Sequence, residues 1–169
     1  MSKAFTRESD DAPEQPIQRP LTPLPPGVKN YITPRGERRL REEMERLLQV
    51  ERPQAAALPD VAAAKSQTQS IDQRVVALEQ SLRTAEVVPP SAQPWEQVRF
   101  GATVTVLDRS GVETRYRIVG VDETDLDRDW VSWRSPLAKA LLNARLGQSV
   151  GFQTPAGEQE LEITAIAYE

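Results

Sequence analysis

Carboxylates, arginines and a few lysines are the charged side chains through which this chain could do chemistry, because its 169 residues include neither histidine nor cysteine. The lack of histidine removes the commonest general base, the commonest metal ligand and the usual serine and cysteine triads. The lack of cysteine removes disulfides and thiolate metal sites. The sequence also holds no phosphate loop and no dinucleotide fingerprint. These absences remove the commonest catalytic and metal sites, and we expect the chain to have no cofactor or metal of its own.

One carboxylate, Asp60, stands alone in the N-terminal half of the chain, since no other acidic residue lies between Glu51 and Asp72. An isolated carboxylate could help to hold a Mg²⁺ ion, but more weakly than a paired site. Asp60 also follows Pro59, an order typical of a turn that ends one helix and caps the next. We favour the turn and keep Asp60 as the one candidate for metal chemistry.

Two other charged clusters lack the pattern of a specific site. The acidic run at 122–129 does not have the glycine and glutamate spacing of an EF-hand calcium loop. Four arginines that could contact RNA are interleaved with glutamates, as on an ordinary solvated helix: Arg35, Arg38, Arg39 and Arg41. The formal net charge of −4 allows at most weak DNA binding.

Two predicted helices with one narrow apolar seam each would position Asp60. Thr33 can cap the first helix, and Pro34 is tolerated at its first position. Both seams follow the helical repeat: Leu40, Met44 and Leu47 in the first helix, and Ile71, Val75, Leu78, Leu82 and Ala85 in the second. Two such seams joined by a turn at 58–60 predict an antiparallel coiled-coil hairpin, which Pro53 should kink or break.

The C-terminal half shows the alternation typical of strands, with turn residues between the alternating segments. These segments lie at 98–106, 113–119, 130–133, 150–154 and 161–168. Ser135 and Pro136 predict the start of one short helix between the third and fourth segments. The order predicts an α+β domain, in which one short helix packs on an antiparallel sheet. Trp130 and Trp133 should face opposite sides of their strand.

These changes of pattern divide the chain into four parts. Residues 1–30 hold six prolines and little apolar sequence, which predicts a disordered tail and leaves a docking peptide open. Residues 31–88 form the arm, 89–96 a linker and 97–169 the α+β domain. No apolar run could span a bilayer or serve as a signal peptide. We therefore expect a cytoplasmic protein without a membrane partner, acting as a monomer.

Several ordered motifs resemble the GreA/GreB transcription elongation factors. The similar residues are 31–43, 51–53 and 71–75 in the arm, and 117–123, 135–142, 147 and 154–157 in the C-terminal domain. The resemblance covers residues 31–169. It is nearer the GreB type, judging by the segments at 51–53 and 117–120.

The resemblance implies an accessory factor that binds RNA polymerase. An FKBP-like domain would dock on the rim of the polymerase secondary channel, and the coiled coil would enter the channel. Acidic residues at the tip of the arm would help to hold the catalytic Mg²⁺ of the polymerase, which then cleaves a backtracked transcript. Contact with nascent RNA through the arginines of the first helix would be indirect.

The resemblance also implies a docking face, made of the short predicted helix and the acidic residues that precede it. The candidate residues are Asp122, Glu123, Ser135, Pro136, Leu137, Ala138, Lys139 and Leu141. Leu137 and Leu141 could equally close the core of the domain, and one helix can do both.

The tip is where this sequence departs from the family pattern, which reads approximately Gly-Asp-x-x-Glu-Asn-Ala-x-Tyr. Residues 54–70 lack the paired carboxylates, the asparagine and the tyrosine. The segment is shorter by roughly a dozen residues, which at ~1.5 Å per residue along each helix shortens the arm by ~10 Å. Positioned metal–water chemistry fails after a displacement of ~1 Å. The sequence therefore predicts polymerase binding without strong cleavage stimulation.

Two other functions stay open. The chain could be a working cleavage factor that rescues arrested polymerase, if an unusual docking pose makes up for the short arm. It could also be an FKBP-like peptide-binding or prolyl isomerase module, although only nine aromatic residues are available to line such a pocket.

Overall fold

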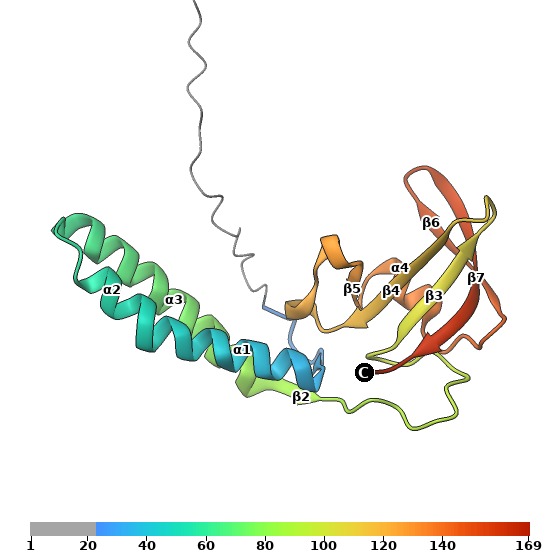
Figure 1. Ribbon diagram of the computed structural model, residues 1–169, viewed down its shortest axis with the longest axis horizontal. Coiled ribbons are helices and arrows are strands. Elements are labelled where there is room, and N and C mark those ends of the chain that lie inside the picture. Colours follow the sequence, from blue (N-terminus) through green and yellow to red (C-terminus); the bar gives the residue numbers. More distant parts are fainter. Residues whose placement is uncertain (1–22) are drawn as a thin grey trace, which may run out of the picture.

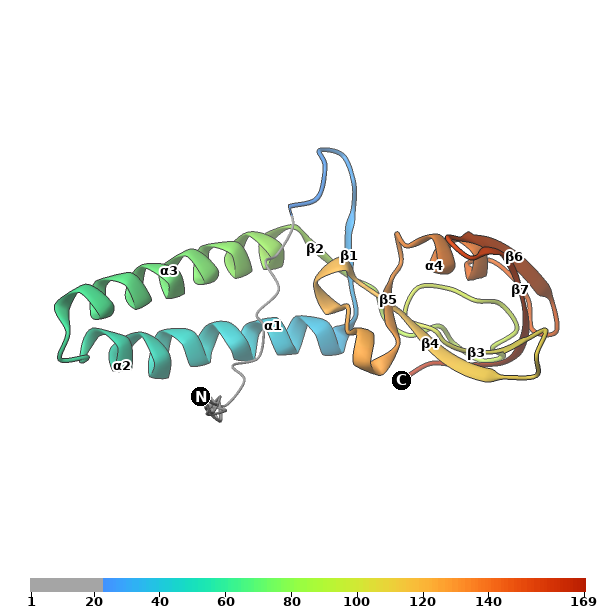
Figure 2. The ribbon, with the colours of Figure 1, turned by 90° about the horizontal axis from the view of Figure 1, so that it is seen from above.

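Thr33 caps the first helix and so begins the arm. Its Oγ1 accepts a hydrogen bond from the backbone N–H of Gly36 at 3.0 Å, and Pro34 opens the helix. The helices of the arm are α1 (Pro34–Arg46), α2 (Arg52–Ala56) and α3 (Val61–Thr84), with a π-helical turn at Leu47–Glu51. In the computed structural model, which describes residues 23–169, α3 runs back beside α1 and α2 (Figures 1 and 2).

The π-helical turn allows the first helix to pass Pro53. Proline has no N–H, and its ring collides with the carbonyl four residues earlier in a regular helix. Just before Pro53, the N–H of Arg52 donates to the carbonyl of Leu47, five residues back, which widens the helix locally. The interruption that the sequence predicts is therefore one widened turn, after which α2 continues the path of α1 (Figure 1).

Both predicted apolar seams lie in the core of the arm. The buried members of this cluster are Ile32, Leu40, Leu47, Val75 and Leu78, and Met44, Ile71, Leu82 and Ala85 pack around them. Two ion pairs bind the helices across the seam, Arg74 to Glu43 and Arg52 to Asp72, each at 2.7 Å. The arm is thus an antiparallel helical pair with its own small core.

A short parallel strand pair at the base of the arm was not predicted. β1 (Asn30–Ile32) pairs with β2 (Ala85–Val87), so that the two ends of the arm are joined by backbone hydrogen bonds. The Asn30 amide donates to the carbonyl of Ser81 at 3.1 Å and to the hydroxyl of Thr84 at 3.2 Å. Strands of three residues are too short to show alternation. Residues 1–22 of the predicted tail, 1–30, lie outside the described part of the chain.

The second part of the fold is a five-stranded sheet with one helix, which makes the protein α+β. Its strands are β3 (Thr103–Asp108), β4 (Glu113–Val119), β5 (Trp130–Ser132), β6 (Ser149–Thr154) and β7 (Gly157–Ala167), and its helix is α4 (Pro136–Leu141). The order across the sheet is β5-β4-β3-β7-β6. Leu141 of α4 and Ile118 of β4 belong to its core, and both are fully buried.

The prediction of a wholly antiparallel sheet is wrong for one strand, because β5 pairs parallel to β4. Two short 3₁₀ turns, Val121–Glu123 and Leu126–Arg128, carry the chain back before β5 begins. The first strand also differs from the prediction, since β3 starts at Thr103 rather than at residue 98. Gly101 has a φ of +84°, which ends the preceding turn and prevents an earlier start.

No helix within residues 23–169 is both long and apolar enough to cross a bilayer.

Adjacent valines on α3 provide a matched test of the core of the arm. Val75 is 7% exposed in the seam, whereas Val76 is 60% exposed on the outer face. We expect Val75→Ala to lower the free energy of unfolding by about 1–3 kcal/mol in urea denaturation, because two buried methyl groups are lost. Val76→Ala, which makes the same change in helix propensity, should leave it within about 0.5 kcal/mol. Equal effects of the two substitutions would contradict this packing.

Candidate functional site

Asp60 occupies the tip of the arm as the cap of α3. Its carboxylate accepts a hydrogen bond from the backbone N–H of Ala62 at 3.0 Å, in the turn that separates α2 from α3. The side chain is exposed, but this bond uses one of its two oxygens. The predicted structural function of Asp60 is confirmed, and its use in metal chemistry stays a prediction.

The neighbouring carboxylates of the arm are held in ion pairs below the tip. Glu51 accepts from Arg46 at 3.0 Å, and Asp72 accepts from Arg52 at 2.7 Å. The hydrogen bond from Arg52 lowers the pKa of the Asp72 carboxyl. Within residues 23–169, no group of three or more acidic side chains comes together as metal ligands would. The tip therefore offers a bound metal one carboxylate.

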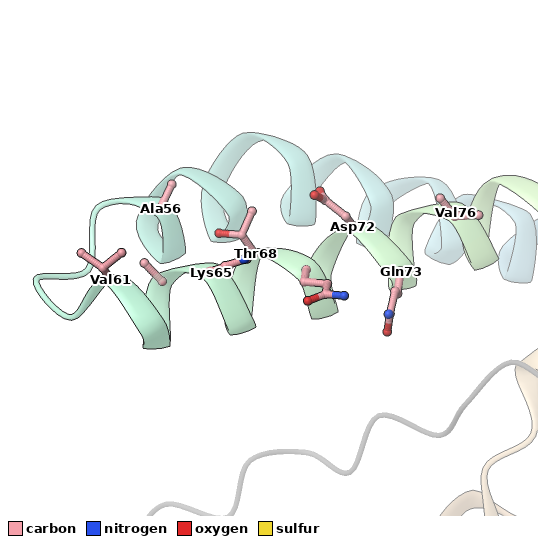
Figure 3. Close-up of a pocket in the computed structure, with 9 residues that line it drawn as sticks. Ala56, Val61, Lys65, Thr68, Asp72, Gln73 and Val76 are labelled. Atoms are coloured by element: carbon pink, nitrogen blue, oxygen red, sulfur yellow. The ribbon is translucent and has the colours of Figure 1, made fainter.

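A shallow groove of about 870 Å³ runs along the outside of the arm behind the tip (Figure 3). Ala56 of α2 and residues of α3 line it, among them Val61, Thr68 and Val76. Lys65 and Asp72 are its only charged lining residues, and they carry opposite charges. This face of the arm is thus lined mostly by small or uncharged side chains and is close to neutral.

The structure divides the predicted docking residues between the core and the surface. Pro136 and Lys139 are exposed on α4, whereas Ala138 and Leu141 are fully buried beneath them. The Ser135 hydroxyl caps α4 by accepting from the N–H of Ala138 at 3.1 Å. Leu137 is partly buried against the domain core. Only one side of α4 could therefore take part in docking.

Glu123, another predicted docking residue, is buried where the arm meets the domain. It is 5% exposed, and its Oε2 accepts from the backbone N–H of Thr33 and of Gly120, each at 2.9 Å. Its Oε1 accepts from the Thr33 hydroxyl, which in turn accepts from the N–H of Gly36. A carboxylate of the domain thus completes the N-terminal cap of α1, where the helix dipole favours negative charge. Its burial places it away from any exposed docking surface.

Two glycines make room for this carboxylate. A Cβ on Gly36 would lie 2.0 Å from Glu123 Oε1, and a Cβ on Gly120 would lie 2.9 Å from Glu123 Oε2 and 2.4 Å from the carbonyl oxygen of Tyr31. Glycine weakens a helix by about 1 kcal/mol relative to alanine. Its presence in the first turn of α1 is therefore explained by the close approach of Glu123. A glycine in the first turn of a predicted helix was the one signal of this contact in the sequence, and it does not identify the partner.

Asp122 and Tyr31 extend the junction on either side of Glu123. The Ser81 hydroxyl of α3 donates to the Asp122 carboxylate. Burial raises the pKa of the Asp122 carboxyl, and the hydrogen bond from Ser81 opposes this effect. Tyr31 packs its ring at 5.8 Å from Phe100 and at 5.2 Å from Trp133. Polar and aromatic contacts thus fix both helices of the arm to the domain.

The arginines of α1 lie in different surroundings. Arg41 pairs with Glu37 at 2.7 Å on the helix surface. Arg35 and Arg39 lie against the ring of Trp130, at 5.5 and 5.6 Å from its centroid. The solvated helix surface that the sequence favours for these four arginines therefore holds for Arg41, whereas Arg35 and Arg39 contact a tryptophan of the domain.

The comparisons with known proteins point to one group. The family model described as "Transcription elongation factor, GreA/GreB, C-term" matches residues 93–168. The chain is 38% identical to transcription elongation factor GreB of Neisseria meningitidis over 155 residues, covering 83% of this chain and 95% of the relative. It is 41% identical over 152 residues to GreA of Alkalilimnicola ehrlichii, covering 81% and 96%. A crystal structure of GreA factor homolog 1 of Thermus thermophilus has 26% identity, coverage of 83% and 99%, and a TM-score of 0.40.

A double-mutant cycle tests the contact between Gly36 and Glu123. We expect Gly36→Ala alone to lower the free energy of unfolding by about 1–3 kcal/mol, although alanine is the better helix former, because the new methyl group collides with the carboxylate. In a Glu123→Ala background the collision is gone, and the same substitution should raise stability by up to about 1 kcal/mol. Urea denaturation measures both. A destabilisation of equal size in the two backgrounds would show that Glu123 is not what requires the glycine.

Proposed function

Because this chain belongs to the GreA/GreB family of transcription elongation factors, we propose that it binds RNA polymerase and modulates elongation or pausing without strongly stimulating transcript cleavage. The observation that carries the proposal is the chemistry of the tip. Asp60 is its single carboxylate, it already caps α3, and the nearest other acids are held in ion pairs. Such a tip can occupy space but cannot supply the paired carboxylates that hold a metal ion.

The reach of the arm supports the same proposal. The alignment with the Neisseria relative spans 155 positions, yet it takes in 83% of this chain, which is about 140 of its 169 residues. About 15 aligned positions therefore lack a counterpart somewhere in this chain, a number large enough to include the dozen residues by which the tip is expected to be shorter. An arm shortened by ~10 Å would stop before the active site of the polymerase.

The remaining parts follow from family membership. We propose that residues 97–169 form an FKBP-like domain which docks on the rim of the secondary channel, and that residues 31–88 pack as a coiled coil which enters it. The continuous seam of the arm and the single exposed side of α4 support this arrangement. Among the candidate docking residues, Pro136 and Lys139 are exposed, and Asp122, Ser135 and Leu137 are partly exposed. Any cleavage of RNA would be catalysed by the polymerase in the cytoplasm.

Transcript cleavage on backtracked elongation complexes tests this function. When backtracked complexes of RNA polymerase are saturated with this chain, we expect the chain to bind without raising the cleavage rate above the intrinsic rate of the polymerase. A cleavage-stimulating GreB relative provides the positive control on the same complexes. Asp60→Asn should leave binding and cleavage unchanged, because its amide oxygen can still cap α3. Brisk cleavage that Asp60→Asn abolishes would mean that the chain is a working cleavage factor.

Charge reversal on the surface tests the docking face. We expect Lys139→Glu on α4 to weaken polymerase binding about tenfold, because an exposed contact of the docking face becomes repulsive. Arg115→Glu on β4 makes the same change in net charge at an exposed position outside the proposed face, so it should change affinity less than about twofold. Equal losses in the two variants would indicate general electrostatic attraction rather than docking through α4.

A further inference from the structure

Arginines gather around the ring of Trp130, where the arm meets the domain. Four guanidinium carbons lie 5.0–5.6 Å from the ring centroid, those of Arg35, Arg39, Arg117 and Arg128. Attraction to the indole face offsets part of the repulsion between them. The whole chain has a net charge of −4. This junction is therefore a local concentration of positive charge on an acidic protein.

A pocket of about 340 Å³ lies beside this cluster. Arg35 and Arg38 of α1, Arg117 of β4 and Glu169 line it, together with apolar and small residues. Both ribbon views place the C-terminal end of the chain near the start of α1 (Figures 1 and 2). The volume is within the range of small-ligand sites. Three guanidinium groups thus converge on one space that could hold a small anion.

Arg117 is the buried member of this set. Its side chain is 7% exposed, and one terminal nitrogen donates to the Glu169 carboxylate. Its Nε has no hydrogen-bond partner among residues 23–169. A buried guanidinium with an unused donor is unfavourable. The Nε is itself buried, so the donors that Arg117 could offer a ligand are its terminal nitrogens, one of which already serves Glu169.

Glu169 pairs with two of these arginines from the surface. Its Oε2 accepts from both Arg35 and Arg117, while its side chain remains 61% exposed. Arg38 makes no hydrogen bond or ion pair with any residue that the structure describes. Three guanidinium groups therefore face one side-chain carboxylate, so the side chains that line the pocket carry a net charge of about +2.

We propose that this pocket binds the phosphate group of a small phosphorylated ligand, with Arg35, Arg38 and Arg117 as donors and Glu169 as an internal competitor. Guanidinium groups donate paired hydrogen bonds to phosphate oxygens, and a phosphate dianion matches this net charge. Because α1 and β4 each contribute donors, the bound phosphate joins the arm to the domain. The ligand thus stabilises the junction that fixes the direction of the arm.

Calorimetric titration of the full chain with inorganic pyrophosphate tests the proposal without polymerase, so that its result is independent of the proposed function. Inorganic phosphate and ATP, titrated separately at matched ionic strength, distinguish a free anion from a nucleotide. We expect saturable binding of at least one of the three, together with a rise in the melting temperature. Glu169→Gln removes the competing charge and should tighten binding about threefold or more, whereas Arg38→Ala should weaken it about tenfold.

Arg41→Ala is the matched control, because Arg41 is an exposed arginine of the same helix that pairs with Glu37 and does not line the pocket. It should bind as the unmodified chain does. Heats no larger than those of a sodium chloride titration would overturn the proposal, as would weaker binding by Glu169→Gln. Tighter binding of a short RNA oligomer than of all three small probes would overturn it in favour of a nucleic-acid phosphodiester.

Discussion

The carboxylate of Glu123 joins the two parts of this protein, and the direction of the arm depends on it. It accepts hydrogen bonds from Thr33, the N-cap of α1, and from Gly120 of the domain. One buried charge thus satisfies donors in both the arm and the domain. Hydrogen bonds to a charged group are worth about 1.5–3 kcal/mol each. The two glycines, the Thr33 cap and the aromatic contacts of Tyr31 are all arranged around this group. Removing this side chain would leave the backbone N–H groups of Thr33 and Gly120 without their acceptor.

Because the base of the arm is fixed to the domain, the length of the arm determines where its tip can reach. Because both helices are attached to the domain, through Thr33 on α1 and Ser81 on α3, the arm cannot pivot freely to make up for missing length. The parallel pair of β1 and β2 closes the base further. The tip then ends in a turn whose one carboxylate is engaged as a helix cap. Firm attachment and an inert tip together suit a protein that occupies a site in its partner without adding catalytic groups.

Periodic and local features of this fold could be predicted from the sequence, and contacts between distant segments could not. The seams of the arm, the caps at Thr33, Asp60 and Ser135, and most strands follow from side-chain spacing and turn chemistry, which are local. The parallel pairing of β5, the strands of three residues and the burial of Glu123 depend on residues about 50 to 90 positions apart or on the path of a crossover. At the candidate site, Asp60 was placed correctly, whereas Glu123 resembled an exposed acid because it follows Asp122 in an acidic run.

The central claim is that this chain occupies the polymerase without supplying cleavage chemistry. Competition on backtracked complexes tests it most directly. Backtracked RNA polymerase would be incubated with a fixed amount of a cleavage-stimulating GreB relative, and the cleavage rate followed as this chain is added. The account predicts that the rate falls with increasing concentration toward the intrinsic rate of the polymerase, because under the proposed function the two proteins would compete for the same channel. A rate that stays constant at saturating concentrations, or that rises, would contradict it.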